Sequence, residues 1–285
     1  AVRAGGGEVV PLAVAEALVW ADPHDGAGLS AALREHHRIR WVQLPWAGIE
    51  DYVPHLDDDH VWTCGKGVYA EPVAEMALGL GLAGLRNLGP YARAAEWTGP
   101  VGTTLVGANV SIIGGGGIAE SLVSMLRAFR SRITVVRRSP GHIDGADEVL
   151  APDRLVDALS GADLVVLALP LTEETDGLIG ADEFSAMEPH ACLVNVARGR
   201  HVVTADLVRA LRNGTIGSAG LDVTDPEPLP AGHPLWSLPN CIVTPHTGNT
   251  PEMAIPLLSE RVRRNVRRFA EGRDLIGLVN VDLGY

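Results

Sequence analysis

The chain has 285 residues, of which 46% are hydrophobic and 20% are charged, and its formal net charge at pH 7 is -12. This composition excludes a disordered chain, and the length suffices for two domains of ordinary size. The acidic balance argues against a nucleic-acid partner, because a phosphate backbone favours a basic protein surface. The most apolar helix-like run, residues 76–85, is too short to span a bilayer, so no membrane partner is expected either.

The three cysteines, Cys64, Cys192 and Cys241, stand far apart in the sequence. Their odd number and wide spacing give neither a disulfide framework nor a C-x-x-C pair, which indicates a reducing, cytoplasmic compartment. Each lies in or near an apolar run, so we interpret them as small buried hydrophobic residues. The N-terminus has no basic segment leading into an apolar core, and we therefore expect no signal peptide.

Short strands and helical segments alternate at the start of the chain, which is typical of a small α/β domain with a parallel sheet. The Gly-rich residues 1–7 are expected to be disordered or a loop tip. No strand precedes them, so we expect that the numbering begins inside the full protein or that a first βα unit is missing. The expected elements are a strand, a helical turn and a second strand within residues 8–20, a helix at 29–36, and strands at 40–44 and 61–64.

Residues 109–129, NVSIIGGGGIAESLVSMLRAF, organise the rest of the chain. A short apolar strand leads into four glycines, and an apolar-periodic helix follows. Gly114, Gly116 and Ala119 fit the pattern G-x-G-x-x-[GA], in which the glycines permit a tight turn and close approach to a pyrophosphate. The helix N-terminus then offers unpaired N–H groups to the phosphates. A glycine cluster alone also fits a flexible loop, but the flanking strand and helix favour a dinucleotide site.

Five more apolar strands follow the glycine turn and alternate with helices, which predicts a doubly wound nucleotide-binding domain. A long helix with a basic patch is expected at 252–269, and we interpret that patch as a solvated face. A last strand at 275–281 could return to the first domain. The other expected helices are 72–88, 153–159, 181–187 and 205–212, and the strands are 110–113, 133–136, 164–169, 192–196, 218–223 and 241–244.

Polar residues follow several of these strands, at the edge where ligands bind in open α/β sheets. Arg198 could hold a carboxylate with two parallel hydrogen bonds, although a surface arginine is the plain alternative. His246 could exchange a proton near neutral pH, and Glu227 could bond its second ring nitrogen. Taken singly, His246 also fits a structural histidine and Glu227 a loop acid; together with Arg198 they form a catalytic set.

These residues and their surroundings resemble the D-isomer-specific 2-hydroxyacid dehydrogenases over most of the chain. The motifs that carry the resemblance are LALPLTEETDGLIG, LVNVARG, GLDVTDPEPLP, HPLWSLPN and IVTPHTG, which together span residues 167–248. The resemblance implies an α/β fold of two domains, a Rossmann nucleotide-binding domain at 70–248 and a smaller flavodoxin-like substrate domain at 1–69 and 249–285. It implies hydride transfer between a nicotinamide cofactor and a 2-hydroxy or 2-keto acid, with Arg198, Glu227 and His246 as the catalytic residues.

The same resemblance implies further site residues, with no metal among the ligands. It implies a cleft between two hinged domains, a homodimer built on the helix at 72–88, and Asp222 on the nicotinamide carboxamide. The substrate carboxylate would be held by Arg198 and by backbone N–H groups of the first domain. These N–H groups belong to Gly48, Ile49, Lys66, Gly67 and Val68. The expected cofactor-binding residues are Gly114, Gly116, Gly117, Ile118, Arg137, Arg138, Ser139, Pro170, Thr175, Val196, Asp222, His246 and Gly248.

One position departs from the family pattern. The second strand of the nucleotide domain usually ends at an acid that bonds the ribose 2′-OH of NAD, but here Arg137 follows it, then Arg138 and Ser139. Arginine pairs with a 2′-phosphate that an acid would repel, so we expect NADP(H) to be preferred, with NAD(H) also accepted. The alternative is that both arginines are merely solvated.

The choice of substrate depends on a few side chains. Trp46, Tyr69 and Trp97 are candidate wall residues, and they favour a glyoxylate or hydroxypyruvate reductase. A D-3-phosphoglycerate dehydrogenase is the nearest enzymatic alternative, although the first domain offers few cations for a phosphate beyond Lys66. A non-enzymatic, dinucleotide-sensing corepressor-like protein and a paralogue without a working substrate domain are further alternatives.

Overall fold

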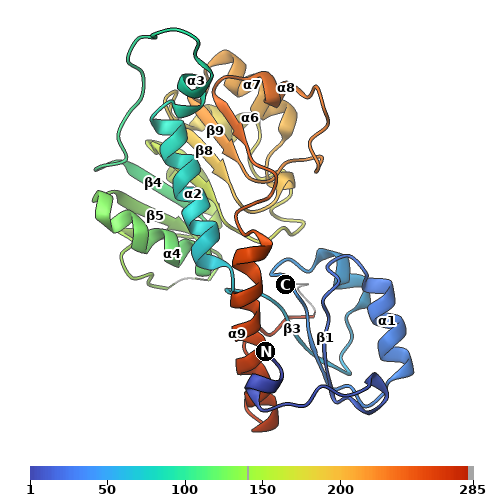
Figure 1. Cartoon of the computed structure of the whole chain (residues 1–285). Helices are drawn as coiled ribbons and strands as arrows, with labels where there is room; N and C mark the ends of the chain where they lie inside the picture. The colour runs from blue at the N-terminus through green and yellow to red at the C-terminus, as the bar shows by residue number, and fades with distance from the viewer. Residues whose placement is uncertain (140, 282–285) are drawn as a thin grey trace. The chain divides into compact units, whose positions relative to one another are not determined.

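The computed structural model describes residues 1–139 and 141–281. The chain divides into two compact units: the first contains Ala1–Tyr69 and the described residues from Thr250 onward, and the second contains Ala70–Asn249. The second unit is therefore continuous in sequence, whereas the first is assembled from both ends of the chain (Figure 1).

The second unit is built on a seven-stranded sheet in the order β10-β9-β8-β7-β4-β5-β6, in which every pair is parallel. The chain starts at the central strand β4, builds outward through β5 and β6, and then crosses to β7 on the other side. This is the doubly wound arrangement that the sequence predicts, and in such folds ligands bind at the carboxyl ends of the strands where the order reverses, here between β4 and β7. The strands are β4 (Asn109–Ile113), β5 (Arg132–Val136), β6 (Glu148–Leu150), β7 (Leu164–Leu167), β8 (Cys192–Asn195), β9 (Ser218–Leu221) and β10 (Cys241–Val243).

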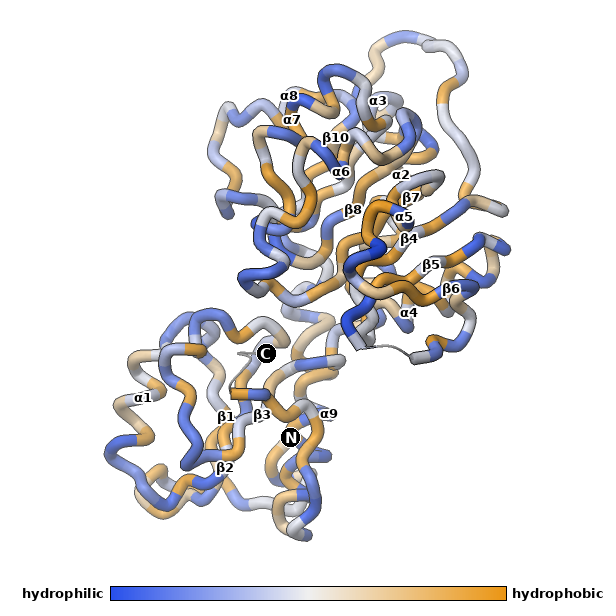
Figure 2. Tube along the Cα trace, turned by 180° about the vertical axis from the view of Figure 1, so that it is seen from behind, coloured by the Kyte–Doolittle hydropathy of each residue, from blue (hydrophilic) through white to orange (hydrophobic). Residues whose placement is uncertain are grey.

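Helices cover both faces of this sheet, which is why its central strands are apolar along their length (Figure 2). Helices α2 and α4 share one apolar cluster with β4, β5, β7 and β8, and α5, α6 and α7 share another with the opposite side of the same strands. The helical segments are α2 (Ala70–Leu85), α3 (Leu88–Arg93), α4 (Gly117–Leu126), η4 (Arg127–Phe129), η5 (Pro152–Arg154), α5 (Leu155–Leu159), α6 (Ala181–Ala186), η6 (Gly199–His201), α7 (Thr204–Asn213) and α8 (Pro234–Ser237).

Helix α2 lies so close to the sheet that two of its glycines are required there. A Cβ at Gly81 would lie 2.9 Å from the side chain of Leu164, and one at Gly84 would lie 2.7 Å from Oγ of Ser218. These glycines therefore pack against strands, and not against another helix. The helix predicted at 72–88 ends earlier than expected because Asn87 has a φ of 55°, in the left-handed region, and α3 begins after it.

The first unit contains a three-stranded parallel sheet in the order β1-β2-β3, flanked by helices. Its core lies between this sheet, α1 and η3 on one side, and between the sheet and α9 on the other. Trp41 of β2 is buried under α9, with its ring centroid 5.3 Å from that of Phe269. The elements are η1 (Arg3–Gly5), η2 (Leu12–Val14), β1 (Ala17–Val19), α1 (Gly26–Glu35), β2 (Trp41–Gln43), η3 (Glu50–His55), β3 (Val61–Thr63) and α9 (Pro251–Ala270).

The N-terminal segment differs from the expectation of a disordered start. Residues 3–5 form the short helix η1, and Gly5 is buried against α9, where an added Cβ would lie 2.6 Å from the carbonyl oxygen of Arg263. Val2 packs on Val262 and Val266 of the same helix. The strand expected just after residue 8 is absent from the described residues, and the segment between residue 8 and β1 contains only the short helix η2.

Two strand predictions also need correction. The strand expected at 275–281 is only an isolated antiparallel bridge between Leu278 and Thr63, although the segment does return to the first unit. The side chain of Asn265 accepts a hydrogen bond from the N–H of Ile276 and donates one to its carbonyl. Gly277 has a φ of 80°, so the backbone here cannot continue a β-ladder with β3. Strand β6 was missed because it has three residues at the sheet edge and little apolar pattern.

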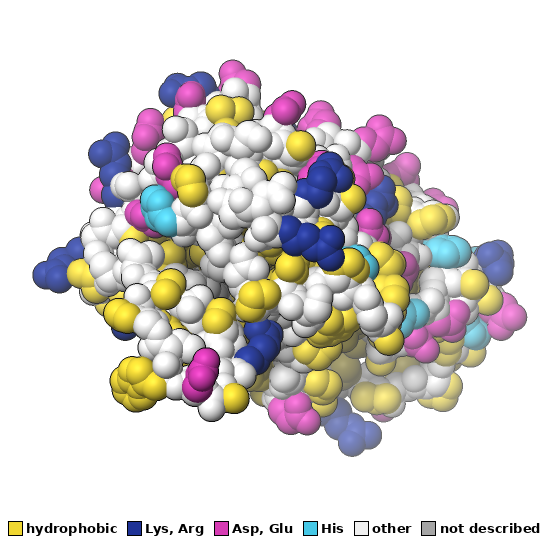
Figure 3. Space-filling model, turned by 90° about the horizontal axis from the view of Figure 1, so that it is seen from above, with side chains coloured by type: hydrophobic (Ala, Val, Ile, Leu, Met, Phe, Trp, Pro, Cys, Tyr) yellow, Lys and Arg dark blue, Asp and Glu magenta, His cyan; other side chains and the backbone are white. Residues whose placement is uncertain are grey.

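Charged side chains show no segregation on the face that Figure 3 presents, where acidic and basic groups are interspersed among apolar ones. On α9, Arg263 pairs with Glu260 at 2.6 Å, while Arg268 donates to the backbone of Asp274. The basic residues of this helix are thus partly bound to their own unit. No helix in residues 1–139 and 141–281 is long and apolar enough to cross a membrane.

Candidate active site

The carboxyl edge of the seven-stranded sheet is held together by backbone hydrogen bonds between the residues that follow each strand. Arg137 N donates to Leu150 O, Gly114 N to Val136 O, Ala168 N to Ile113 O, Val196 N to Leu167 O, Asp222 N to Asn195 O and Thr244 N to Leu221 O. Each strand therefore delivers its next residues to one continuous edge. The predicted cofactor and catalytic residues of this unit all follow these strand ends.

The glycine turn after β4 fits a dinucleotide. Gly114 has a φ of 121°, and its Cα faces the backbone of Ala168, where a Cβ would overlap the carbonyl group. Gly116 is the N-cap of α4 without a side-chain cap, and space around it is open within 4 Å. The first N–H groups of α4, from Gly117 and Ile118 onward, are thus left for an external anion, which is what a pyrophosphate requires.

Arg137 lies directly beside this turn. It follows β5, and its side chain passes over Gly115, where an added Cβ would lie 2.8 Å from Cβ and Cδ of the arginine and 3.0 Å from its Nε. The glycine is needed because any larger residue would displace the arginine. Arg138 and Ser139 follow and are exposed. No acidic residue stands at the position where NAD-binding domains place one.

Arg198 is presented by a rigid turn at the end of β8. The buried amide of Asn195 donates to the carbonyl of Arg198 at 2.8 Å and accepts the N–H of Ala197 at 3.0 Å. The guanidinium itself donates to the carbonyl of Ala197 at 2.7 Å. These contacts hold the arginine on the carboxyl edge, so the surface-arginine alternative does not describe its surroundings.

The residue after Arg198 supports a stability prediction. A Cβ at Gly199 would overlap the carbonyl group of Thr224 and lie 2.5 Å from the backbone N of Asp225. Gly199→Ala should destabilise the second unit by about 3 kcal/mol, because backbone must move. The matched control is Gly79→Ala on the exposed face of α2, where nothing lies within 4 Å and a gain of up to about 1 kcal/mol is expected. Urea unfolding of both variants measures the difference; equal midpoints would contradict the close approach.

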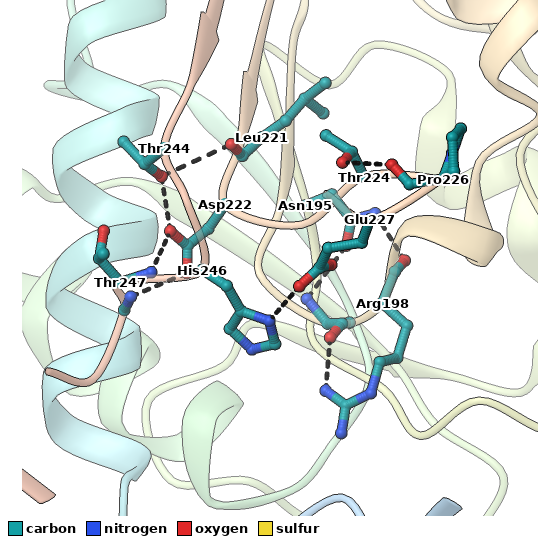
Figure 4. A network of polar contacts seen from close by, with 12 residues as sticks. Asn195, Arg198, Leu221, Asp222, Thr224, Pro226, Glu227, Thr244, His246 and Thr247 are labelled. Atoms are coloured by element: carbon teal, nitrogen blue, oxygen red, sulfur yellow. Dashed lines mark hydrogen bonds and ion pairs between the residues drawn. The ribbon is translucent and has the colours of Figure 1, made fainter. Parts of the chain in front are cut away.

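Asp222 fixes the turn that carries His246 (Figure 4). Its buried carboxylate accepts the hydroxyl of Thr244 at 2.5 Å and the backbone N–H groups of Thr247 and Gly248 at 2.9 and 2.8 Å. His246 N also donates to the Asp222 carbonyl at 2.9 Å. His246 has a φ of 53°, an uncommon value for a non-glycine residue, and these bonds maintain it. The structure thus shows Asp222 positioning His246, in addition to any contact with a cofactor.

His246 and Glu227 form a pair in which Nδ1 of the imidazole lies 2.7 Å from Oε1 of the carboxylate. This hydrogen bond raises the pKa of His246, while burial and the positive charge of Arg198 oppose the rise. The same bond lowers the pKa of Glu227, so the carboxylate stays ionised. Among the described residues Nε2 of His246 has no hydrogen-bond partner. The contact therefore favours the protonated imidazole, in which one N–H is directed to Glu227 and the other is left for a ligand.

The fully buried His201 was missed by sequence reasoning. Its Nδ1 lies 2.9 Å from the carbonyl of Arg198, and its Nε2 lies 3.3 Å from the carbonyl of Pro170. Burial lowers its pKa, which favours a neutral ring that donates to one of the two carbonyls. His201 thereby joins the turns after β7 and β8. A histidine three residues after Arg198 was the only signal in the sequence.

Thr175, on the loop after β7, uses its hydroxyl within that loop. Its Oγ1 accepts the N–H of Thr172 at 2.8 Å and donates to the carbonyl of Pro170 at 3.0 Å. The loop is thus shaped before any ligand binds, and the predicted cofactor contacts of Pro170 and Thr175 stay predictions.

In the first unit, the loops after β2 and β3 lie against each other at the carboxyl edge of the small sheet. Gly65 N donates to Trp46 O at 2.7 Å, and the Tyr69 hydroxyl donates to Pro45 O at 2.7 Å. The rings of Trp46 and Tyr69 are 5.6 Å apart. Burial raises the pKa of Tyr69 to about 12, so its hydroxyl remains a donor.

The amides predicted to hold a carboxylate differ in their availability. The N–H of Val68 already donates to the carbonyl of Gly65 at 2.9 Å. In contrast, within the described residues the N–H groups of Gly48, Ile49 and Gly67 make no hydrogen bond. Gly67 is also exposed, with a φ of 75° and open space around it. Gly67 is therefore the best placed of these donors.

Trp97 does not lie at this kind of edge. It is fully exposed on the loop between α3 and β4. That loop is tied to the opposite edge of the large sheet, because Arg93 donates to the carbonyls of Pro239 and Cys241, where β10 begins. Trp97 is thus remote from the carboxyl edge of its own unit, and its role as a wall residue of the substrate cleft stays a prediction.

A doubly wound sheet with an open glycine turn and an Arg/Glu/His group on the same edge defines a nicotinamide-dependent dehydrogenase of two domains. Residues 76–248 match the family model "D-isomer specific 2-hydroxyacid dehydrogenase, NAD binding domain". The chain is 30% identical over 283 residues to glyoxylate/hydroxypyruvate reductase A of Serratia proteamaculans. This alignment covers 94% of this chain and 87% of that protein.

Solved structures agree with this. The D-isomer specific 2-hydroxyacid dehydrogenase of Xanthobacter autotrophicus, in complex with NADPH and MES, has a TM-score of 0.82 and 28% identity, over 97% of this chain and 87% of that one. The NADPH-dependent glyoxylate/hydroxypyruvate reductase of Sinorhizobium meliloti, in complex with NADP and sulfate, has a TM-score of 0.83 and 25% identity, over 95% and 87%. The chain belongs to the D-isomer-specific 2-hydroxyacid dehydrogenase family. It is an oxidoreductase that transfers a hydride between a nicotinamide cofactor and a 2-hydroxy or 2-keto acid.

Proposed function

We propose that the enzyme reduces a small 2-keto acid, glyoxylate or hydroxypyruvate, and prefers NADPH to NADH. The observation that carries the direction is the His246–Glu227 pair, whose contact raises the pKa of His246 and so favours a proton donor. The relatives named above as glyoxylate/hydroxypyruvate reductases support the substrate class. Arg137 beside the glycine turn, and the NADPH and NADP in two related structures, support the cofactor preference.

The residues of the second unit have distinct roles in this proposal. Bound NADPH supplies the hydride that reduces C2 of the keto acid. Arg198 pairs with the substrate carboxylate and polarises the neighbouring carbonyl group. His246 donates its Nε2 proton to the carbonyl oxygen as that oxygen gains charge, and Glu227 stabilises the imidazolium before transfer. The products are a 2-hydroxy acid, the oxidised dinucleotide and a neutral His246.

Backbone and side-chain groups together supply the remaining contacts in the proposal. The glycine turn and the N-terminus of α4 hold the pyrophosphate, and Arg137, Arg138 and Ser139 hold a 2′-phosphate. In this proposal Asp222 would bond the nicotinamide carboxamide, Val196 and Gly248 would contact the cofactor, and the amides of the first unit would hold the substrate carboxylate. The homodimer through α2 and the cytoplasmic location stay predictions.

A spectrophotometric panel at 340 nm tests the activity. It offers glyoxylate, hydroxypyruvate, pyruvate and phenylpyruvate with NADPH and with NADH, and D-3-phosphoglycerate with NADP and with NAD. We expect glyoxylate or hydroxypyruvate with NADPH to give a kcat/KM of about 10⁴ M⁻¹ s⁻¹ or more. Preference for D-3-phosphoglycerate would assign the other enzymatic branch. If the protein binds the dinucleotide tightly but turns over no substrate of the panel, the reductase assignment is contradicted and a dinucleotide-sensing protein is favoured.

A further inference from the structure

Arg261 of α9 is a half-buried arginine whose partners are all backbone carbonyls. It donates to Lys66 O at 2.9 Å, to Cys64 O at 3.1 Å and to Ile276 O at 3.4 Å. It pairs with no carboxylate among residues 1–139 and 141–281, although Arg263, two positions on, does. Burial without an acidic partner lowers the pKa of Arg261, yet an arginine remains charged in proteins. The fold therefore maintains an uncompensated positive charge behind the loop after β3.

Anchoring the C-terminal segment does not require this charge. Asn265, one turn along α9, is fully buried and bonds both the N–H and the carbonyl of Ile276, each at 2.9 Å. Asn265 also donates to Oε1 of Gln43, which joins α9 to β2 at 3.1 Å. The neutral amide thus performs the structural attachment. Arg261 adds the hydrogen bonds to the carbonyls of Cys64 and Lys66, which fix the loop after β3.

The carbonyl of Lys66 and the N–H of Gly67 belong to one peptide group. A strong donor on the carbonyl polarises the whole amide, which makes its N–H a better donor in turn. Arg261 occupies the carbonyl side of this peptide, while the N–H side has no partner in the described residues and is exposed. The next amide, that of Val68, is already bonded to Gly65. A single polarised N–H is therefore left for an anion.

We propose that Arg261 is a positioning residue, which fixes and polarises the Lys66–Gly67 peptide so that the Gly67 N–H binds the carboxylate of the 2-keto acid. This inference rests on the proposed function. The arginine acts through the peptide and touches neither substrate nor cofactor. Its charge adds a favourable field for an anionic substrate.

The test compares Arg261→Met and Arg261→Lys with Arg263→Met. This control removes the same charge from the same helix, but within the part of the chain that the structure describes the Arg263 side chain bonds only Glu260. For Arg261→Met we expect KM for glyoxylate to rise about tenfold or more, with kcat within about twofold. The kcat/KM for methyl glyoxylate, an uncharged ester, should change by less than about twofold. A merely structural role of Arg261 would instead lower kcat/KM for both substrates. Arg261→Lys keeps the positive charge but cannot make all three hydrogen bonds to the backbone carbonyls. Its KM for glyoxylate should therefore lie between those of the wild type and Arg261→Met.

A binding measurement separates this inference from the proposed activity. Calorimetry with oxamate, a carboxylate analogue of a 2-keto acid, should give a Kd about tenfold weaker for Arg261→Met than for the wild type, with NADPH affinity unchanged. If the wild type reduces no 2-keto acid but this loss is seen, the activity fails and the positioning role stands. If the wild type turns over normally, two results for Arg261→Met overturn the positioning role: an equal loss of kcat/KM with glyoxylate and with the ester, or no loss with either. Should Arg261→Met not fold, an unchanged oxamate Kd in Arg261→Lys overturns it as well.

Discussion

Replacing Arg137 by aspartate is expected to reverse the dinucleotide preference of the enzyme. The side chain follows β5 and lies across Gly115, beside the turn that would hold the pyrophosphate. In that place arginine can pair with the 2′-phosphate of NADPH, whereas aspartate repels the phosphate and accepts the 2′-OH of NADH. The ratio of kcat/KM for NADPH to that for NADH should fall about 100-fold or more, since each charged hydrogen bond contributes roughly 1.5–3 kcal/mol.

The matched control for this experiment is Arg130→Asp. Arg130 is exposed just before β5, at the opposite edge of the sheet, and its φ of 56° is one that aspartate tolerates. It changes the net charge by the same amount, so any general electrostatic effect on dinucleotide binding appears in both variants. If Arg137→Asp and Arg130→Asp keep the same cofactor ratio as the wild type, Arg137 is a solvated residue and the NADP assignment fails.

The larger domain was predictable because its signals are local. An apolar strand, a glycine turn and an amphipathic helix give a βα unit that needs little else, and the strands buried on both faces appear as continuous apolar runs. Six of its seven strands were identified in this way. Strand β6 was not, since an edge strand of three residues, Glu148–Leu150, is stabilised by its neighbour β5 more than by its own pattern.

The first unit was harder to predict because contacts distant in sequence decide it. Residues 1–7 are small and Gly-rich, which locally favours disorder, but α9 covers them and uses Gly5 for a close approach. Within the described residues, the segment at 275–281 pairs with β3 only through an isolated bridge, because Asn265 bonds Ile276. No window of sequence contains both members of either contact.

The site divides in the same way. Arg198, Glu227 and His246 stand at strand ends within ordered motifs, so the sequence could nominate them. The roles of His201 and Arg261 arise from the backbone carbonyls that they contact, those of Arg198 and Pro170 for His201 and that of Lys66 for Arg261. A lone histidine or a helix arginine carries no such information in the sequence. Asp222 was nominated as a cofactor contact, and its bonds to the turn of His246 emerge only in three dimensions.

His246 is expected to give the largest loss of activity. His246→Asn removes the proton donor, and kcat for keto-acid reduction should fall about 10³-fold, within the range of general acid catalysis. Exposed His37 provides the control, since His37→Asn should leave kcat unaltered. A loss below about tenfold for His246→Asn would mean that another group donates the proton.

The pH dependence of reduction identifies the partner of His246. The hydrogen bond that the imidazole donates to Glu227 raises the pKa of His246. Burial and the charge of Arg198 oppose this rise, whereas the charge of Asp222 adds to it. Reduction needs the protonated ring, so kcat should be constant at low pH and fall as pH rises through the raised pKa. Glu227→Gln removes the main cause of the rise, so the midpoint of this fall should move to lower pH, and kcat at neutral pH should drop about tenfold or more. Measurement of kcat at saturating NADPH from acidic to alkaline pH decides the matter. An unmoved midpoint in Glu227→Gln would show that the 2.7 Å contact does not control the proton.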